Sequence, residues 1–557
     1  MINRGAHRVA GSLLVLAAVA LTAPAARAAA IGVTTAVDEF NTNPAACSLR
    51  EAIHSANQNS NAQAPGCVAG GPNDTISVPG GLYRISGALS EDGNLGGDLD
   101  IRAAGGPLTV AAVPGAEPVV SGAGIERVFD VVDVGASATL TGLEITGGED
   151  TYGGGIQNNG SLSLSGVTLT ANHASGFGGA IWNGGTMIIA DSVIERNSSD
   201  SFAGAIDHGG AGASLSISRT TIRDNYAGFF YGAILSDGPL VIDRSVISGN
   251  RAKTSTGGLT IESGGASIKN STIAGNSAGY DIGGIYVQDY PFTTTLINTT
   301  VVRNSATDAT ATSPRGGGIY RDAGNDSVVR LKDTIVALNT DASSNPAPDC
   351  FGTVASLGHN LLGKTQGCAY AAGAGDIIGA DPLLGPLADN GGPTRTVRPL
   401  AGSPALEAGA SALRTDQRGM PRPVDILGVP NLANGADIGA VELAASNLCQ
   451  GVPATIVGTD RADTLTGTGK ADVILAAGGN DRVKAGKGSD RVCGGNGNDL
   501  IKGGPGNDTL QGENGKDRLL GQAGEDILRG GRGADTLIGG AARDKLSGGP
   551  GKDKPRQ

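Results

Sequence analysis

Short runs of alternating apolar and polar residues recur through the middle of the chain, from about residue 153 to residue 339. The pairs Leu162/Leu164 and Met187/Ile189 are typical of this alternation. A period of two predicts strands with one buried face rather than helices. A Gly-Gly or Gly-small turn precedes each run, so the runs are units of a repeat.

An asparagine closes each of these repeats. The asparagines are 25 to 35 residues apart, at Asn172, Asn197, Asn225, Asn250, Asn276, Asn304 and Asn339. Repeats of this length predict stacked units that bury their apolar faces only against one another. Three short strands per repeat, stacked in register, predict a right-handed parallel β-helix over residues 101–345. Asn tolerates the left-handed backbone conformation, and stacked amides can hydrogen-bond along the axis, so we interpret these asparagines as structural rather than as glycosylation sites.

The N-terminus has the features of an export signal. Residues 1–28 combine a basic start, an apolar run shorter than a bilayer span, and a small-x-small site at Ala26-Arg27-Ala28. The chain is therefore expected to be secreted, extracellular or associated with the cell surface. Six cysteines in an exported chain predict disulfides. Their spacing favours the local pairs Cys47–Cys67, Cys350–Cys368 and Cys449–Cys493, although other pairings stay open.

Residues 29–100 are predicted to form an N-terminal cap and the first strands. Ser48 and Glu51 have the spacing of a capping box, and Leu49, Ala52 and Ile53 would form the apolar face of a helix. Such a helix would cover the open end of the β-helix. The segment Cys-Ser-Leu-Arg-Glu-Ala that begins at Cys47 resembles the CSLREA-type N-terminal region of secreted bacterial β-helix proteins.

A second resemblance covers residues 346–450. The segments 381–387, 390–394, 416–419 and 437–442 resemble, in this order, the choice-of-anchor Q region, which implies the C-terminal region of a β-helix. Four charged residues of these segments could form a site, but we favour a salt-bridged cap over the last rung. They are Asp416, Arg418, Asp437 and Glu442.

From residue 458 a period of nine replaces the longer repeat. An aspartate occupies the sixth position of eleven successive repeats: Asp463, Asp472, Asp481, Asp490, Asp499, Asp508, Asp517, Asp526, Asp535, Asp544 and Asp553. An aliphatic residue stands two positions after nearly every aspartate, as Ile501 follows Asp499. Glycines at the second and fourth positions permit positive φ and let carbonyl oxygens face inward; the candidates are Gly495, Gly497, Gly504, Gly506, Gly531 and Gly533.

This pattern matches the hemolysin-type (RTX) calcium-binding nonapeptide. The resemblance implies a parallel β-roll over residues 451–557, with two repeats per turn and every second aspartate stacked on one side. Ca²⁺ prefers six to eight oxygen ligands, so we predict Ca²⁺ as the bound ion, with the first ten aspartates and the six glycines above as candidate ligands. Without the ion the stacked carboxylates repel one another, and folding of the repeats is expected to require it.

Composition limits the remaining possibilities. Gly accounts for 93 of 557 residues, aromatic residues for 3% and charged residues for 17%. A mean hydropathy of −0.03 excludes a disordered chain and a polytopic membrane protein. We expect no nucleic-acid partner and no transmembrane segment in the mature chain.

The sequence thus predicts a secreted calcium-binding β-solenoid with a structural, adhesive or surface-binding role rather than an enzyme. Carboxylates and bases are sparse on the repeats and do not recur at one position, and nucleophile-elbow, Walker and zinc signatures are missing. The alternative is a polysaccharide-active enzyme, a pectate-lyase-like lyase or a hydrolase on the β-helix. Cell-surface or environmental glycans are candidate partners beside calcium. Four aromatic residues could form a sugar platform, although we favour packing of the turns: Trp182, Phe229, Phe230 and Tyr231.

Overall fold

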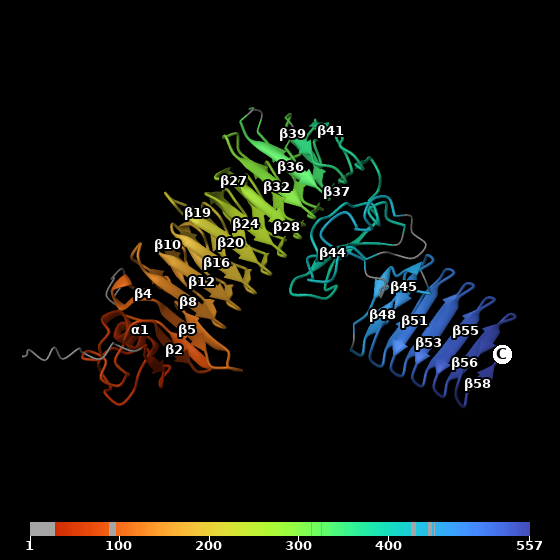
Figure 1. Ribbon diagram of the computed structural model, residues 1–557, viewed down its shortest axis with the longest axis horizontal. Coiled ribbons are helices and arrows are strands. Elements are labelled where there is room, and N and C mark those ends of the chain that lie inside the picture. The colour runs from red at the N-terminus through yellow and green to blue at the C-terminus, as the bar shows by residue number, and fades with distance from the viewer. Residues whose placement is uncertain are drawn as a thin grey trace, which may run out of the picture.

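The computed structural model describes residues 28–557, except 88–95, 314, 323, 325, 401, 425–430, 444–447, 451 and 460. Apart from its last residue, the predicted signal segment 1–28 lies outside the described residues. Two stacks of strands form the arms of a bent molecule, and residues of the 380–450 region lie at the bend (Figure 1). No helix among the described residues has the length and apolarity that a bilayer span requires.

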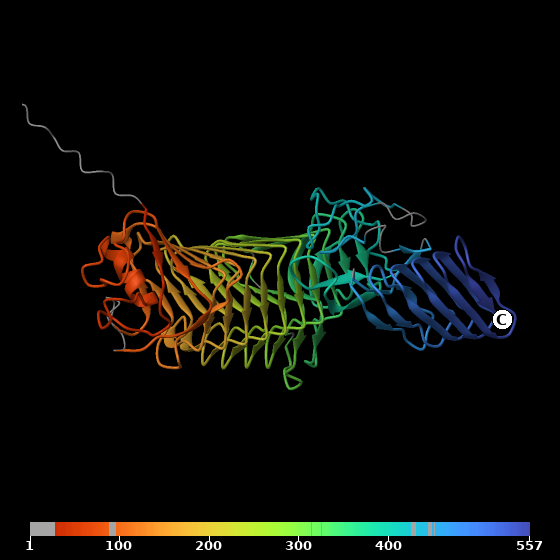
Figure 2. The same ribbon diagram turned by 90° about the horizontal axis from the view of Figure 1, so that it is seen from below.

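Parallel strands wound into rungs form the longer arm, which confirms the predicted β-helix (Figure 2). Its sheets contain 22, 8 and 12 strands. The 22-stranded sheet consists of two stacks of strands, here called ribbon I and ribbon II. Strand β39 (Cys350–Ser356) pairs with a strand of each ribbon and so joins them.

The strands of the β-helix have the following bounds. Ribbon I consists of β1 (Ala30–Gly32), β2 (Asp74–Val78), β5 (Leu108–Ala112), β8 (Ser137–Thr141), β12 (Ser161–Ser165), β16 (Thr186–Ala190), β20 (Ser214–Ser218), β24 (Leu240–Asp243), β28 (Ala266–Lys269), β32 (Thr293–Ile297), β36 (Val328–Lys332) and β41 (Cys368–Ala371). Ribbon II consists of β4 (Leu99–Ile101), β7 (Phe129–Val131), β11 (Ile156–Asn158), β15 (Ile181–Asn183), β19 (Ile206–Gly209), β23 (Ile234–Asp237), β27 (Leu259–Ser263), β31 (Ile285–Val287) and β35 (Ile319–Arg321). The 12-stranded sheet consists of β3 (Gly81–Arg84), β6 (Pro118–Ser121), β9 (Glu144–Thr146), β13 (Thr168–Thr170), β17 (Val193–Glu195), β21 (Thr221–Arg223), β25 (Val246–Ser248), β29 (Thr272–Ala274), β33 (Thr300–Val302), β37 (Ile335–Ala337), β40 (Leu361–Leu362) and β42 (Ile377–Ile378). The 8-stranded sheet consists of β10 (Glu149–Tyr152), β14 (His173–Phe177), β18 (Ser198–Ser199), β22 (Tyr226–Ala227), β26 (Arg251–Ala252), β30 (Ser277–Ala278), β34 (Ser305–Ala306) and β38 (Thr340–Asp341).

Each central rung therefore has four strands where the sequence predicted three. The rung built from β15, β16, β17 and β18 shows the difference. The additional strand comes after the asparagine and is mostly two residues long. A two-residue strand is too short to display an alternation. The inward residues of the other strands, such as Ile156, Ile181 and Ile206, pair in register and are fully buried, which forms one continuous core.

The asparagine column forms a continuous ladder of amide hydrogen bonds, as predicted. Asn172 Nδ2 donates to Asn197 Oδ1 at 3.0 Å, and the series continues rung by rung to Asn339, whose Nδ2 donates to Asp349 Oδ1 at 2.9 Å. The predicted left-handed conformation of the asparagines is wrong. The residue before each asparagine adopts it instead: Ala171, Arg196, Asp224, Gly249, Gly275, Arg303 and Leu338. That turn aims the following amide inward, where it also donates to a carbonyl, as Asn172 does to Ile145 O.

The predicted capping helix is present as α1 (Leu49–Gln58). Ser48 and Glu51 form the capping box, with the Ser48 hydroxyl accepting from the Glu51 backbone N–H. Arg50 is buried, and its guanidinium pairs with Asp38 at 2.8 Å and donates to the carbonyl of Gly97 at 2.7 Å. The short 3-10 helix η1 (Ala103–Gly105) lies beside α1. These contacts tie the helix to the first rungs.

Residues between 380 and 443 pack along the side of the β-helix rather than over its last rung. They include the hairpin of β43 (Leu384–Ala388) and β44 (Thr396–Pro399). Gln417 reaches back to Thr272 Oγ1 at 2.6 Å and to Ser245 O at 3.1 Å, far from the last strand, β42. The predicted cap over the last rung is therefore wrong; polar side chains such as Thr272 and apolar ones such as Val302 and Ile335, from several rungs, supply the docking surface.

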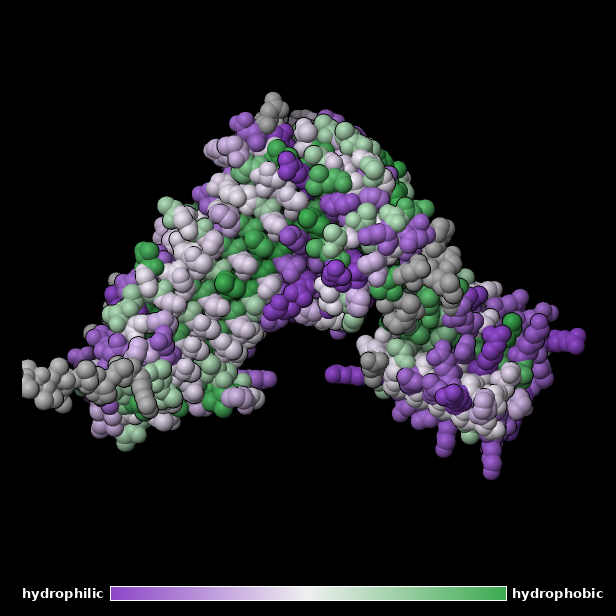
Figure 3. Space-filling model, in the orientation of Figure 1, coloured by the Kyte–Doolittle hydropathy of each residue, from purple (hydrophilic) through white to green (hydrophobic). Residues whose placement is uncertain are grey.

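Two six-stranded parallel sheets form the shorter arm, the predicted β-roll. One sheet contains β47 (Ile456–Val457), β49 (Val473–Leu475), β51 (Arg491–Asn496), β53 (Thr509–Asn514), β55 (Ile527–Arg532) and β57 (Lys545–Ser547). The other contains β48 (Thr464–Thr466), β50 (Arg482–Lys484), β52 (Leu500–Pro505), β54 (Arg518–Ala523), β56 (Thr536–Ala541) and β58 (Lys554–Arg556). The aliphatic residues two positions after the aspartates form its thin core, from Ile474 to Leu537. Hydrophilic residues cover much of the visible face of the roll (Figure 3).

The six cysteines form three disulfides in the structure. Cys47 pairs with Cys67 beside α1, and Cys350 with Cys368 between β39 and β41. Cys449 pairs with Cys493. Cys449 ends β45 (Leu448–Cys449), which pairs with β46 (Val452–Pro453), whereas Cys493 lies in β51. The third disulfide thus links the segment that precedes the roll to one of the first turns of the roll.

Candidate calcium site

The repeat aspartates stack on two sides of the roll, one turn apart. The backbone N–H of Asp481 donates to Asp499 Oδ1 at 2.8 Å, and the same bond links Asp499 to Asp517 at 2.9 Å. On the other side, Asp490 donates in the same way to Asp508 at 2.8 Å. One oxygen of each central carboxylate is therefore used to hold adjacent turns in register.

Among the described residues, the second carboxylate oxygen of the central aspartates has no hydrogen-bond partner. Eight Oδ2 atoms are buried and lack a hydrogen bond: those of Asp481, Asp490, Asp499, Asp508, Asp517, Asp526, Asp535 and Asp544. An uncompensated buried carboxylate oxygen is costly. A series of such oxygens at one repeat position fits the binding of a cation.

Glycine at the first repeat position leaves space beside six of these oxygens, whereas alanine (Ala476 and Ala485) takes that position before Asp481 and Asp490. A Cβ on Gly530 would lie 2.5 Å from Asp535 Oδ2 and 2.5 Å from the carbonyl oxygen of Gly548 on the adjacent turn. On Gly494 it would lie 2.5 Å from Asp499 Oδ2 and 2.8 Å from Gly512 O. A carboxylate oxygen and a carbonyl oxygen thus face the same space, which is the donor chemistry that Ca²⁺ requires.

The six glycines predicted from the sequence are needed for the close stacking of the turns. Gly495, Gly497, Gly504, Gly506, Gly531 and Gly533 all have positive φ, between 98° and 144°. A Cβ on Gly497 would overlap the carbonyl oxygen of Gly479 on the preceding turn. These residues allow the turns to approach one another, whereas the space beside Oδ2 lies at the first-position glycines that the sequence analysis did not select. The signal was their recurrence every nine residues from Gly494 to Gly548.

The first two predicted ligands differ from the central ones. Asp463 Oδ2 accepts hydrogen bonds from the backbone N–H and the hydroxyl of Thr459, at 2.7 and 2.9 Å. Asp472 Oδ2 is bound in the same way by Thr468. Threonine occupies the second position in these repeats, and its two donors satisfy the oxygen that is unpartnered in the centre.

Burial raises the pKa of the central carboxyl groups. The pKa of Asp481 rises to about 6, and those of Asp508 and Asp517 rise to about 7. Desolvation is the main cause, and neighbouring repeat aspartates add to it. A bound divalent cation would favour the ionised forms instead.

The metal-free roll should therefore be more stable at mildly acidic than at neutral pH. Between about pH 4 and pH 7 its folded form binds more protons than the unfolded chain, so its stability falls as the pH rises. With calcium the order should reverse, because the ligands must be deprotonated. Circular dichroism at pH 5 and 7.5 tests this: in chelator the roll should keep more strand signal at pH 5, and in calcium it should keep more at pH 7.5. The same pH order under both conditions would contradict it.

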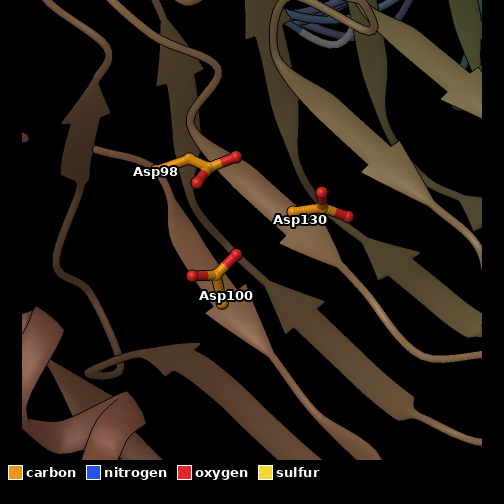
Figure 4. A group of neighbouring side chains, drawn as sticks. All are labelled: Asp98, Asp100 and Asp130. Atoms are coloured by element: carbon orange, nitrogen blue, oxygen red, sulfur yellow. The ribbon is translucent and has the colours of Figure 1, made fainter. Parts of the chain in front are cut away.

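Another acidic cluster lies near the N-terminal cap of the β-helix. Asp98, Asp100 and Asp130 are buried, and their carboxylates gather at β4 and β7 (Figure 4). Arg127 pairs with Asp98 at 3.0 Å and with Asp130 at 3.2 Å. Burial raises the pKa of Asp98, while Arg127 opposes the increase. We interpret the cluster as an ion-paired part of the cap and assign no metal to it.

The four charged residues of the region near 416–442 form a buried network rather than an open site. Asp416 pairs with Arg418 at 2.7 Å, and Arg422 pairs with Glu442 at 2.8 Å. Asp437 Oδ2 accepts from the Leu443 N–H at 2.6 Å. Burial raises the pKa of Asp437 and of Glu442. The network holds the laterally packed segment together.

Comparison with known proteins agrees with the geometry of the roll. Residues 457–492, 494–528 and 520–554 match the family described as RTX calcium-binding nonapeptide repeat. Comparison with curated protein sequences gives no match.

The solved structures that resemble the chain include two lyases. The pectate lyase Pel9A has 14% identity and a TM-score of 0.40, over 67% of this chain and 88% of its own. A PL6 family alginate lyase, AlyGC, has 10% identity and a TM-score of 0.29, over 87% and 78%. At these values neither resemblance bears on function. The C-terminal region carries RTX calcium-binding repeats, in which calcium is a structural ligand.

Proposed function

We propose that the protein is a secreted calcium-binding β-solenoid with a structural, adhesive or surface-binding role, whose C-terminal repeats fold when calcium binds. The row of eight buried, unpartnered Oδ2 atoms carries this proposal. The match to the RTX repeat supports the identity of the ion.

The residues that would hold calcium are the central repeat aspartates, from Asp481 to Asp544, with carbonyl oxygens of adjacent turns such as Gly512 O and Gly548 O. Calcium supplies positive charge that offsets the desolvation of these carboxylates. The chain itself supplies register, because each Oδ1 binds the backbone of the neighbouring turn. From Asp499 to Asp544, the first-position glycines keep the space beside Oδ2 free of side-chain atoms.

Three disulfides support an extracellular or cell-surface location, since disulfides persist in oxidising compartments. The whole chain has a formal net charge of −12, yet Lys and Arg slightly outnumber Asp and Glu after residue 458. The roll therefore does not attract cations through a net negative charge, and its calcium sites depend on the geometry of the turns.

Calorimetric titration of calcium into the wild-type protein and two Asp508 variants tests the proposal. Asp508→Asn keeps an oxygen to accept the Asp490 N–H, whereas Asp508→Ala removes it. Both should bind about one or two fewer ions per chain, because each repeat carboxylate lies between adjacent turns. Asp508→Ala should also loosen the local register.

The matched control is Asp200→Asn, which removes an exposed carboxylate from the β-helix. It should bind as many ions as the wild type. The proposal fails if the wild-type protein binds no calcium, or if Asp200→Asn and Asp508→Asn lose the same number of ions.

A further inference from the structure

A groove on the outer face of ribbon II takes no part in the calcium chemistry. It includes a depression of about 290 Å³ whose lining contains Tyr231, Glu262 and Tyr286. A second depression of about 600 Å³ shares Glu262 and Gln288 with the first. Together they have the size of ligand sites in proteins, which are roughly 300–1,000 Å³.

The groove lies where one stack of aromatic rings ends and another begins. The first stack consists of Tyr152, Phe177, Phe202 and Phe230, with successive ring centroids 5.2, 4.8 and 4.7 Å apart. In the second, Tyr320 lies 6.0 Å from Tyr286 and 4.6 Å from Phe351. The rung between them contributes the small residue Ser255 to the lining and places Thr260 in register with Tyr286. These small side chains leave the depression between aromatic walls.

Two tyrosine–carboxylate pairs give the groove its polar groups. The Tyr231 hydroxyl donates to Glu262 Oε1 at 2.7 Å, and the Tyr286 hydroxyl donates to Asp322 Oδ2 at 2.7 Å. Within the described part of the chain, the other oxygen of each carboxylate has no hydrogen bond. The tyrosines hold these oxygens in place, so each carboxylate presents a fixed acceptor beside an aromatic ring.

The lining has an excess of negative charge. Glu262, Asp281 and Asp322 face one cation, Arg315, whose Nη1 lies 2.6 Å from Asp281 Oδ1. Asp237 adds a further carboxylate in the adjoining depression. Because Arg315 is already paired, an acidic ligand would meet unbalanced negative charge, and such like-charge contacts are costly.

We propose that this groove binds an uncharged glycan chain. A pyranose ring presents apolar C–H faces that pack against Tyr and Phe rings, and hydroxyls at its rim that donate to the carboxylates of Glu262 and Asp322. Polyuronates lack this complementarity of charge. The inference deepens the proposed surface-binding role by naming the ligand class, and it does not depend on the calcium sites.

The test measures binding of the full-length mature protein, in millimolar calcium, to neutral and acidic hexasaccharides by calorimetry. The neutral probes are cellohexaose, xylohexaose and chitohexaose, and the acidic ones are hexagalacturonate and hexamannuronate. We expect binding of at least one neutral probe and no binding of either acidic probe. Tyr286→Ala should weaken the neutral complex about tenfold or more, and Glu262→Gln, which keeps the side-chain volume, should weaken it roughly tenfold.

The control is Tyr226→Ala, which removes an exposed tyrosine outside the groove and should leave affinity unchanged. The inference is overturned if no neutral probe binds, if the acidic probes bind more tightly, or if Glu262→Gln and Tyr286→Ala bind like Tyr226→Ala. Calcium stoichiometry measured on the same samples separates this failure from a failure of the proposed calcium role.

Discussion

Chelation of calcium is expected to unfold the β-roll, residues 452–557, and to leave the β-helix folded. The roll has a thin aliphatic core and eight buried carboxylate oxygens without partners. Each site filled at about 100 times its dissociation constant adds about 2.7 kcal/mol to stability, so losing several sites removes an amount comparable with the ~5–15 kcal/mol of an ordinary domain. The described part of the β-helix is stabilised instead by the asparagine ladder and a continuous apolar core.

Thermal scans with circular dichroism, paired with limited proteolysis, would separate the two arms. In EGTA, proteolysis should remove the roll and spare a fragment that ends near residue 450; in calcium, the chain should stay intact. Magnesium should not replace calcium, because it is smaller and requires near-octahedral coordination. Simultaneous loss of both arms in EGTA, or an equally protected roll with and without calcium, would refute the assignment.

Gly530→Ala is expected to remove calcium binding from its turn, because its Cβ would occupy the space beside Asp535 Oδ2 and displace the Gly548 carbonyl. Its Cβ would fill the space that lies 2.5 Å from both Asp535 Oδ2 and Gly548 O. The backbone of Gly530 does not adopt the positive φ of its neighbour Gly531. Calorimetry should show about one or two fewer ions per chain.

Two other glycines provide controls for this substitution. A Cβ on Gly469 meets no atom within 4 Å, so Gly469→Ala should bind calcium like the wild type. Gly533 has a φ of 144°, and its Cβ would overlap Gly515 O. Gly533→Ala should therefore destabilise the roll even in saturating calcium. If Gly530→Ala and Gly469→Ala bind equal numbers of ions, the space beside Oδ2 is not the calcium site.

Periodicity was sufficient to predict the two solenoids. The period of two, interrupted every 25 to 35 residues, identified the rungs, and the unbroken period of nine identified the roll. The capping of α1 by Ser48 and Glu51 could also be predicted from the sequence, because a capping box depends only on residues close together along the chain. Features that recur with the repeat are visible in one sequence.

Features that depend on contacts between turns could not be predicted from the sequence. The left-handed residue precedes each asparagine, as Ala171 precedes Asn172, and it varies in type, so no residue marks it. Thr459 and Thr468 satisfy the first two carboxylates, although the nine-residue count treats all aspartates alike. The lateral docking of Gln417 depends on pairs more than a hundred residues apart.

The asparagine ladder is directional, and that property bears on how such a chain could change its size during evolution. Each amide donates to the next rung and accepts from the previous one, until Asp349 ends the series as an acceptor. Duplicating the DNA that encodes one rung would insert an asparagine with both of its partners restored, leaving α1 and the lateral segment untouched. The length of the β-helix, and hence the reach of the protein, can therefore vary in whole-rung increments.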